Sequence, residues 1–405
     1  MAQCRICGGS VDEFFDFGRQ PVSDSFVTPE TVDSEFYFRL AAGICTSCTM
    51  VQLLEEVPRE RMFHEDYPYR SSGSSVMHEH FETFARQLLE TELAGERAFI
   101  VEIGSNDGTM LKTVGRAGVR HLGVDPSAQV GEFARADGVR VRTDFFQEST
   151  AREIAAEDGP ADVIYSANTT SHIAYIDSVF RGADALLAPD GIFVIEDRYL
   201  GSIMAQNAFD QIYDEHFYLF SVSSVRRMAE TFGFRLIDVE PLSVHGGSMR
   251  YTIGRPGART PSPRIAEYLE LERAQGLASP ETYQRFGERV RRTSRELVEL
   301  LEKLRAEGRT IVGYGATAKS ATAINYCGIG TDLIPYICDS TPAKQGRLTP
   351  GAHIPVRPPE AFSDPYPDYA LLFAWNHAEE IMAKEEGFRE AGGRWILYVP
   401  DVHIA

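Results

Sequence analysis

The stretch of sequence that decides the fold is VEIGSNDG at residues 101–108, which follows an apolar run and precedes a helical stretch beginning near Thr109. Gly104 and Gly108 allow the backbone to approach a ligand closely. The stretch differs from the GxGxxG loop that binds dinucleotides, because Glu102 places a carboxylate where a pyrophosphate would lie. Such a carboxylate would repel a diphosphate, but it could accept hydrogen bonds from the ammonium group of an amino acid. We therefore expect a ligand site at the end of this strand.

Further strands are expected on both sides of this loop. They are Ala98–Ile103, Arg120–Val124, Val139–Thr143, Ala161–Ala167, Gly191–Ile195, Phe234–Val239 and Met249–Ile253. Alternation with helical stretches indicates an α/β fold, and the continuous apolar character of the first five runs favours a parallel sheet covered on both faces. Asp125 follows the second run about 20 residues after the glycines, where a carboxylate accepts hydrogen bonds from ribose hydroxyls. The alternative is a glycine-rich turn in a sheet that binds no cofactor.

Two CxxC pairs lie in the first 60 residues, in a segment that is rich in turn formers and lacks a helical period. They comprise Cys4, Cys7, Cys45 and Cys48. Four thiolates can close a tetrahedral zinc site that leaves no position for water or substrate, so we expect structural zinc. A redox role for one pair is the competing interpretation. Cys327 and Cys338 lie in apolar runs and are expected to be buried thiols.

A second, smaller α/β unit is expected at the end of the chain. A helix from about Pro280 to Glu307 carries one apolar stripe, and it precedes strands at Thr310–Tyr314, Leu333–Asp339, Tyr369–Phe373 and Trp395–Val399. The loop GYGATAK at residues 313–319 resembles a dinucleotide turn but lacks the third glycine. We interpret the unit as a degenerate Rossmann domain that holds the nucleotide of a substrate, with NAD binding as the alternative. Lys344 and Arg347 are the expected partners of a diphosphate.

Length and charge exclude several classes of function. The chain has 405 residues, enough for two or three domains, and its net charge of −19 repels nucleic acids and anionic membranes. No apolar run reaches the roughly 20 residues that span a bilayer. We expect a cytoplasmic monomer that contacts neither nucleic acid nor membrane. A zinc-dependent interaction module is the non-enzymatic alternative.

Two histidines are candidates for acid–base chemistry. His216 and Glu215 are polar residues inside the aromatic stretch YDEHFYLF at 213–220, and His172 follows the fourth expected strand closely. An imidazole beside a carboxylate and the phenol of Tyr213 provides what proton abstraction next to a carbonyl requires. Structural histidines in an aromatic core are the alternative interpretation.

With these motifs together, the chain resembles the nucleotide-sugar C-methyltransferases of deoxysugar pathways. The resemblance rests on the two CxxC pairs, residues 102–108, the YDEHF run at 213–217, the GYGATAKS loop at 313–320, and the segments KQGR at 344–347 and PGAHIP at 350–355. It implies an α/β fold with a class I methyltransferase Rossmann-like sheet. A zinc-binding module at 1–65 and a degenerate Rossmann-like domain at 241–405 would flank the methyltransferase domain at 66–240.

The resemblance also implies roles for individual residues. S-adenosylmethionine (SAM) would be bound by Glu102, Gly104, Asn106, Gly108, Asp125, Asp144, Phe145 and Asn168. His216 matches the general base, with Tyr213 and Glu215 as companions, His172 as a second imidazole and Tyr67 entering from the linker. Lys319, Lys344 and Arg347 would bind the substrate.

The implied reaction is methylation of a ring carbon next to the keto group of a dTDP-4-keto-deoxysugar. Base-catalysed enolate formation would precede methyl transfer, and C-3 is favoured over C-5. An NAD-dependent oxidoreductase and a SAM-dependent O-methyltransferase are the alternative enzymes.

Overall fold

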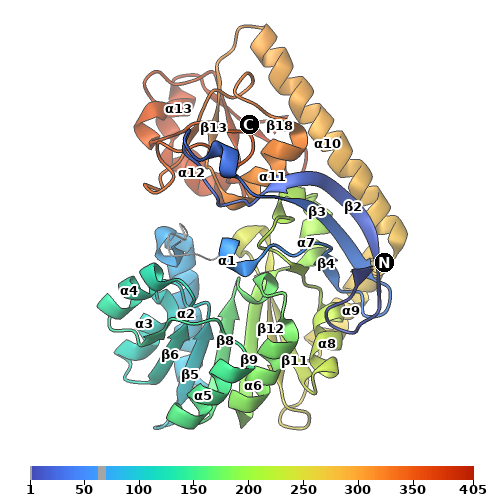
Figure 1. Ribbon diagram of the computed structural model, residues 1–405, viewed down its shortest axis with the longest axis vertical. Coiled ribbons are helices and arrows are strands. Elements are labelled where there is room, and N and C mark those ends of the chain that lie inside the picture. Colours follow the sequence, from blue (N-terminus) through green and yellow to red (C-terminus); the bar gives the residue numbers. More distant parts are fainter. Residues whose placement is uncertain (1, 63–69) are drawn as a thin grey trace.

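The computed structural model describes residues 2–62 and 70–405, which form three β-sheets with their helices. A seven-stranded sheet and its helices make one end of the molecule, and a six-stranded sheet makes the other (Figure 1). The five-stranded sheet of the N-terminal part and the long helix α10 (Pro280–Ala306) run along the side and connect the two ends (Figure 1). None of the helices in the described ranges is long and apolar enough to cross a membrane.

The seven-stranded sheet, called the middle sheet because its strands come from the middle part of the chain, has the order β11-β12-β9-β8-β5-β6-β7. The strands are β5 (Phe99–Ile103), β6 (Arg120–Val124), β7 (Val141–Arg142), β8 (Ala161–Ala167), β9 (Leu187–Arg198), β11 (Arg235–Leu242) and β12 (Ser248–Gly254). All seven expected strands are present. The first five are parallel, as expected, whereas β12 is antiparallel to both of its neighbours. Because β12 completes this sheet, the sheet extends beyond the expected domain boundary at residue 240.

Apolar side chains of β5 point alternately to the two faces of this sheet, and both faces are covered by helices. Ile100 packs with the core of α2 (Ser75–Glu90) and α3 (Thr109–Arg116), whereas Phe99 and Val101 belong to the core on the opposite face. The helices of that opposite face include α5 (Glu148–Asp158), α6 (Ile176–Leu186) and α8 (Val222–Thr231). Successive side chains of a strand point to opposite faces, so a continuous apolar run is buried on both.

The N-terminal part, in which the sequence showed turn formers but indicated no strand, is an antiparallel sheet. Its order is β1 (Ala2–Gln3), β2 (Ser10–Pro21), β3 (Tyr37–Cys45), β4 (Val51–Leu53) and β10 (Tyr218–Leu219). The last strand comes from the middle of the chain. Tertiary contacts stabilise the long hairpin, because Phe14 lies 4.7 Å from the ring of Tyr283 on α10, and Phe17 lies 5.2 Å from that of Tyr326.

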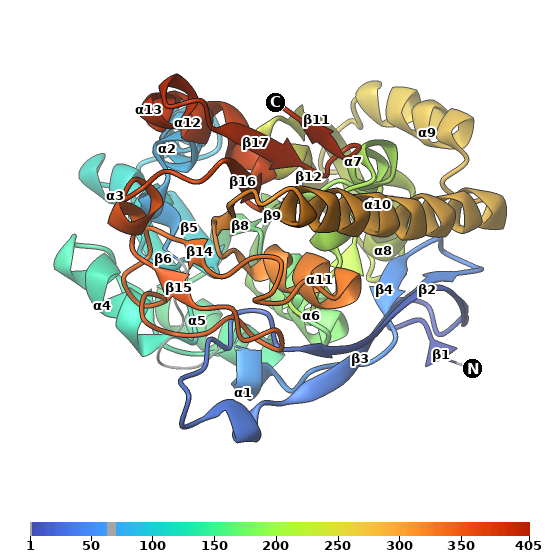
Figure 2. The same ribbon diagram turned by 90° about the horizontal axis from the view of Figure 1, so that it is seen from above.

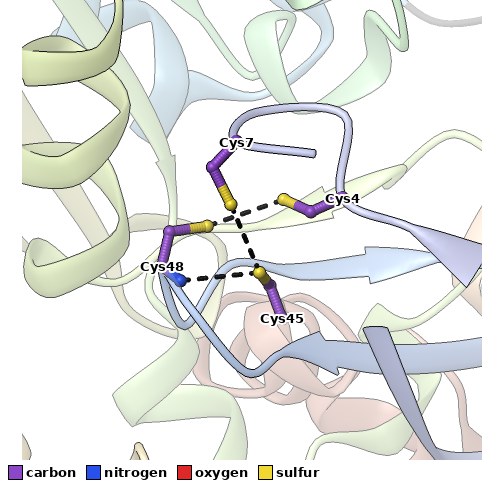
Figure 3. A group of neighbouring side chains, drawn as sticks. All are labelled: Cys4, Cys7, Cys45 and Cys48. Atoms are coloured by element: carbon purple, nitrogen blue, oxygen red, sulfur yellow. Dashed lines mark hydrogen bonds between the residues drawn. The ribbon is translucent and has the colours of Figure 1, made fainter. Parts of the chain in front are cut away.

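The four N-terminal cysteines converge at one end of this sheet (Figure 3). Sγ of Cys4 lies 3.5 Å from Sγ of Cys48, and Sγ of Cys7 lies 3.5 Å from Sγ of Cys45. All four sulfur atoms lie within 4.8 Å of one another. Zn–S bonds of about 2.3 Å place tetrahedral ligands roughly 3.8 Å apart, so the cluster fits one zinc ion with four protein ligands.

The C-terminal sheet has the order β15-β14-β13-β16-β17-β18. Its strands are β13 (Ile311–Tyr314), β14 (Ile337–Cys338), β15 (Val356–Arg357), β16 (Tyr369–Leu372), β17 (Arg394–Leu397) and β18 (His403–Ile404). All are parallel except β18. The strand order reverses beside β13, whose carboxyl end carries the 313–319 loop and α11 (Ala318–Cys327). Ligands of open α/β sheets bind at such a point. Seen from above, α10 and α11 lie over the middle sheet (Figure 2).

We predict that Cys4→Ser lowers zinc content from about one ion per chain to near zero and lowers folding yield with it, because a structural zinc site contributes its binding free energy to folding. Metal analysis of purified protein and thermal unfolding measure the two effects. Cys327→Ser is the matched control, because that thiol lies outside the cluster. Zinc-free protein of unchanged stability would contradict the prediction.

Candidate functional site

A pocket lies at the carboxyl ends of β5, β6 and β8, where the strand order of the middle sheet reverses. Its empty volume, together with the open solvent at its mouth, is about 1030 Å³. Seven of the expected site residues line it: Glu102, Gly104, Asn106, Asp125, Phe145, Asn168 and His172.

The glycine-rich loop has a backbone that few residues could adopt. Gly104 has φ 70°, and a Cβ atom there would lie 2.2 Å from Oγ1 of Thr169. Gly108 has φ 77°, and its Cβ would lie 2.9 Å from that of Ala134. Both positions therefore require glycine, for conformation and for space. Between them, Asn106 also has a positive φ of 49°, which is uncommon outside glycine.

Asp125 connects this loop to the end of β6. Its Oδ2 accepts a hydrogen bond from the Asn106 amide at 2.9 Å, and its Oδ1 accepts one from the Ser127 amide at 2.9 Å. Burial raises the pKa of this carboxyl, and the two amides oppose that shift. Each carboxylate oxygen can accept more than one hydrogen bond, so the group retains capacity for ligand hydroxyls.

Glu102 is a buried carboxyl that faces the pocket. Its Oε2 has no hydrogen-bond partner among the described residues. Burial raises the pKa of Glu102 well above its ordinary value, and the carboxyls of Asp107 and Asp125 add to the shift. A ligand ammonium group would supply the missing charge and hydrogen bonds, so the site fits the amino-acid end of SAM.

Of the two expected cofactor residues that follow β7, only one lines the pocket. Phe145 lines it, whereas the carboxyl of Asp144 is beside it and accepts from the Phe145 amide at 2.8 Å and from the Thr150 hydroxyl at 3.3 Å. Arg59 of α1 (Arg59–Met62), which no sequence motif marks, also lines the pocket. Its guanidinium lies 4.1 Å from the ring centroid of Phe145 and 5.0 Å from that of Tyr175.

The linker after the N-terminal part contacts the glycine-rich loop. The amide of Ser71 donates to Oδ1 of Asn106 at 3.0 Å, and the amide of Ser72 donates to Oδ2 of Asp107 at 3.0 Å. Tyr67 lies outside the described residues. The pocket residues Arg59 and Ser71 occur on either side of it in the sequence.

The predicted acid–base residues lie together beside the pocket. The rings of His172 and His216 are 5.4 Å apart, and the ring of Tyr213 lies 4.0 Å from that of His216. Oε2 of Glu215 lies 3.9 Å from Nδ1 of His172. His172 ends the short helix η3 (Thr170–His172), directly after β8. Residues 213–216 precede β10, which belongs to the N-terminal sheet.

The hydrogen bond of His216 defines its tautomer. Nδ1 lies 2.6 Å from the carbonyl oxygen of Gln211, which can only accept, so Nδ1 carries the proton. Nε2 therefore carries a lone pair, and it has no partner among the described residues. Burial, the Arg198 guanidinium and His172 hold the pKa of His216 well below its ordinary value. The imidazole is therefore neutral at working pH, rather than titrating near it.

Arg198 was also missed by the sequence analysis, because nothing in its sequence surroundings marks it. It ends β9, and its Nη1 donates to Oδ1 of Asn168 at 3.1 Å. The guanidinium is largely buried, and its Nε has no partner among the described residues. Burial and the charge of Arg198 lower the pKa of His172 to about 3.

The three expected substrate cations have different surroundings. Lys319 is buried, and its ammonium lies 4.3 Å from the ring of Trp375. Lys344 donates to the Ala316 carbonyl at 2.8 Å and lies 3.4 Å from a carboxylate oxygen of Asp24. Arg347 is exposed and donates to the Phe26 carbonyl at 3.3 Å.

Family models match three consecutive parts of the chain: a putative zinc binding domain at 4–63, a methyltransferase domain at 77–239 and a C-methyltransferase C-terminal domain at 243–400. The C-methyltransferase NovU of Streptomyces niveus is 35% identical over 99% of this chain and 96% of its own length. The chain belongs to this C-methyltransferase family. The protein therefore binds SAM, and its class I methyltransferase fold is confirmed. It binds zinc through its four N-terminal cysteines.

Other similar proteins match a smaller share of this chain. A ubiquinone biosynthesis O-methyltransferase of Azorhizobium caulinodans is 31% identical over 30% of this chain and 46% of its own length. Among solved structures, a SAM-dependent methyltransferase of Anabaena variabilis is 17% identical, with a TM-score of 0.34, and covers 43% of this chain and 84% of its own. A magnesium protoporphyrin IX methyltransferase of Synechocystis with bound SAH is 12% identical, with a TM-score of 0.35, over 45% and 88%.

We predict that Asp125→Ala weakens binding of SAM and of S-adenosylhomocysteine (SAH) by about 1–3 kcal/mol, the scale for a lost hydrogen bond to a charged buried group. Isothermal titration calorimetry measures the affinity directly. The matched control is Asp137→Ala, which removes an exposed carboxylate that pairs with Lys112. Unaltered affinity in Asp125→Ala would remove this carboxylate from the cofactor site.

Proposed function

We propose that the C-methyltransferase acts on a dTDP-4-keto-deoxysugar and methylates the carbon next to the keto group, C-3 rather than C-5. The observation that carries the proposal is the buried, neutral His216, whose Nε2 lone pair is unpartnered among the described residues and lies beside the cofactor pocket. A carbon next to a ketone is acidic enough for such a base. The likeness to NovU supports carbon as the methylated atom.

In the proposed reaction, Nε2 of His216 removes the ring proton and the substrate becomes an enolate. Bound SAM supplies a methyl group that is activated by a positively charged sulfur. Glu102 and Asp125 would hold the amino-acid end and the ribose of that cofactor, and this would orient its methyl group. The hydrogen bond from Nδ1 to Gln211 keeps the imidazole in the tautomer and orientation that proton removal requires.

The remaining polar residues stabilise charges that develop during the reaction. The Tyr213 hydroxyl and the His172 imidazole are the proposed donors to the enolate oxygen, and Tyr67 is a third candidate. Glu215, beside His172, offsets the positive charge that the imidazole pair gains with the proton. The four cysteines leave no open position on zinc, so the metal has a structural role.

We expect His216→Asn to lower kcat by roughly 10²–10⁴-fold while both ligands still bind, because the variant keeps the size of the side chain but removes the base. The measurement is methylation of a dTDP-4-keto-6-deoxysugar, with the product position determined by NMR. Exchange of the ring proton with deuterated solvent, with SAH in place of SAM, reports proton removal separately. His403→Asn, an exposed histidine, is the control. Near-normal methylation by His216→Asn would transfer the role of base to another residue.

The pH profile provides an independent prediction. Because the pKa of His216 is lowered, kcat/KM should stay at its plateau as the pH falls through 6.5 and decline only at lower pH, where the base becomes protonated. The charged or titratable groups that act on His216 are Arg198, His172 and His245. Arg198→Met removes one positive charge, so its acid limb should lie at higher pH. An identical profile in both proteins would contradict this electrostatic origin.

A further inference from the structure

The strand β10 begins two residues after His216 and is an edge strand of the N-terminal sheet. It pairs antiparallel with β4, so that Tyr218 lies directly opposite Gln52. Between His216 and the strand, the carbonyl of Phe217 accepts a hydrogen bond from the amide of Leu53 at 2.8 Å. The backbone position of His216 therefore depends on where the N-terminal part places β4.

The side chain of Gln52 connects β4 to the first cysteine pair. This side chain is buried, its Oε1 accepts from the amide of Arg5 at 3.0 Å, and its Nε2 donates to the carbonyl of Gln3 at 3.4 Å. Gln3 and Arg5 are the two neighbours of Cys4 in the sequence. The guanidinium of Arg5 also lies 5.7 Å from the ring centroid of Phe217. The cysteine pair thus contacts both β4 and the residue that follows His216.

The side chain of Tyr218 reaches the second imidazole of the site. Its hydroxyl donates to the carbonyl of Ala174 at 3.0 Å, two residues after His172. Burial raises the pKa of Tyr218 well above its ordinary value, so the hydroxyl keeps the proton that it donates. On the other side of His172, the amide and the hydroxyl of Ser171 donate to Asp197 at 3.0 and 2.8 Å. His172 therefore lies between two residues that hydrogen bonds hold in place.

Both imidazoles belong to short elements whose positions depend on such tertiary contacts. His172 ends the three-residue helix η3, and His216 precedes the two-residue strand β10. Groups that react must be held in place by the residues behind them. A displacement of about 1 Å can lower a rate by up to roughly 100-fold. The contacts of β10 are therefore expected to affect catalysis as well as stability.

We propose that Gln52 and Tyr218 are positioning residues for the two imidazoles. Gln52 attaches β4 to the first cysteine pair, and β4 in turn holds β10 and His216. The Tyr218 hydroxyl holds the loop that carries His172. The inference rests on the proposed function, in which His216 is the base and His172 donates to the enolate oxygen. The described residues that line the cofactor pocket include neither Gln52 nor Tyr218, so the two residues act through the imidazoles and not on SAM.

The test compares Tyr218→Phe and Gln52→Met in the zinc-loaded enzyme. Tyr218→Phe removes one hydrogen bond and should lower kcat for a dTDP-4-keto-6-deoxysugar roughly 3- to 10-fold, the factor for one net hydrogen bond. Gln52→Met removes two and should lower kcat roughly 3- to 30-fold. The Kd of SAH and the zinc content should stay unchanged in both variants.

Tyr336→Phe is the matched control. Its hydroxyl also donates to an alanine carbonyl, that of Ala361 at 3.1 Å. Tyr336 directly precedes β14, at the end of the C-terminal sheet opposite to the edge where such sheets bind ligands. This variant should change kcat less than about 2-fold.

Double variants separate a positioning role from a general loss of stability. A positioning residue has no further effect once the group that it positions is gone. In the His172→Gln background, Tyr218→Phe should therefore change kcat less than about 2-fold, and so should Gln52→Met in the His216→Asn background. Tyr218→Phe decides the question if Gln52→Met folds poorly.

Three results would overturn the inference: kcat values equal to that of Tyr336→Phe, effects that multiply in the double variants, or a loss of SAH affinity or zinc that accounts for the lower kcat. Near-normal methylation by His216→Asn would instead overturn the proposed function. The two failures are therefore distinguishable.

Discussion

The ionisable side chains at the carboxyl edge of the middle sheet are buried by residues from all three parts of the chain. Loss of water raises the pKa of Glu102 and lowers the pKa of His216. Each residue thereby favours its neutral form, and a nearby opposite charge, such as a ligand ammonium group beside the carboxyl, favours the charged form again. The same enclosure lowers the pKa of Lys319 at the far side of the site. Exclusion of water is thus the constraint on which the chemistry of this edge depends.

The N-terminal part contributes to this enclosure beyond its zinc site. Its segment 22–27 lies between the two α/β units, where the amide of Ser23 donates to Oδ1 of Asp214 at 3.0 Å and Asp24 faces Lys344. Asp214 is two residues from His216, so the segment helps to position the loop that carries His216. Burial raises the pKa of Asp214 to about 7. Arg59 of the same part reaches the end of the cofactor pocket that Phe145 lines. The zinc cluster fixes the start of the sheet from which these contacts extend.

In both α/β units, a carboxylate at the end of a strand binds the amides of a neighbouring glycine-rich loop. In the middle sheet, Asp125 accepts hydrogen bonds from the amide of Asn106 in the glycine-rich loop and from the amide of Ser127. In the C-terminal sheet, Asp339 accepts from the amides of Ala316 and Thr341, both at 2.7 Å. Each carboxylate fixes a glycine-rich loop at the point where the strand order reverses. The acidic Glu102 distinguishes the cofactor loop from the C-terminal loop, which carries Lys319 instead.

The sequence by itself determined the seven strands of the middle sheet, the glycine-rich loop, the carboxylates that follow it and the four metal ligands. Each of these depends on local spacing or on a conformation that few residues can adopt. Only the tertiary structure decided the N-terminal sheet, because its fifth strand and its aromatic partners come from distant parts of the chain. It also decided the places of Arg59, Arg198 and His245, which no local pattern marks. The tautomer and pKa of His216 depend on Gln211, Arg198 and burial, and these are properties of three-dimensional proximity.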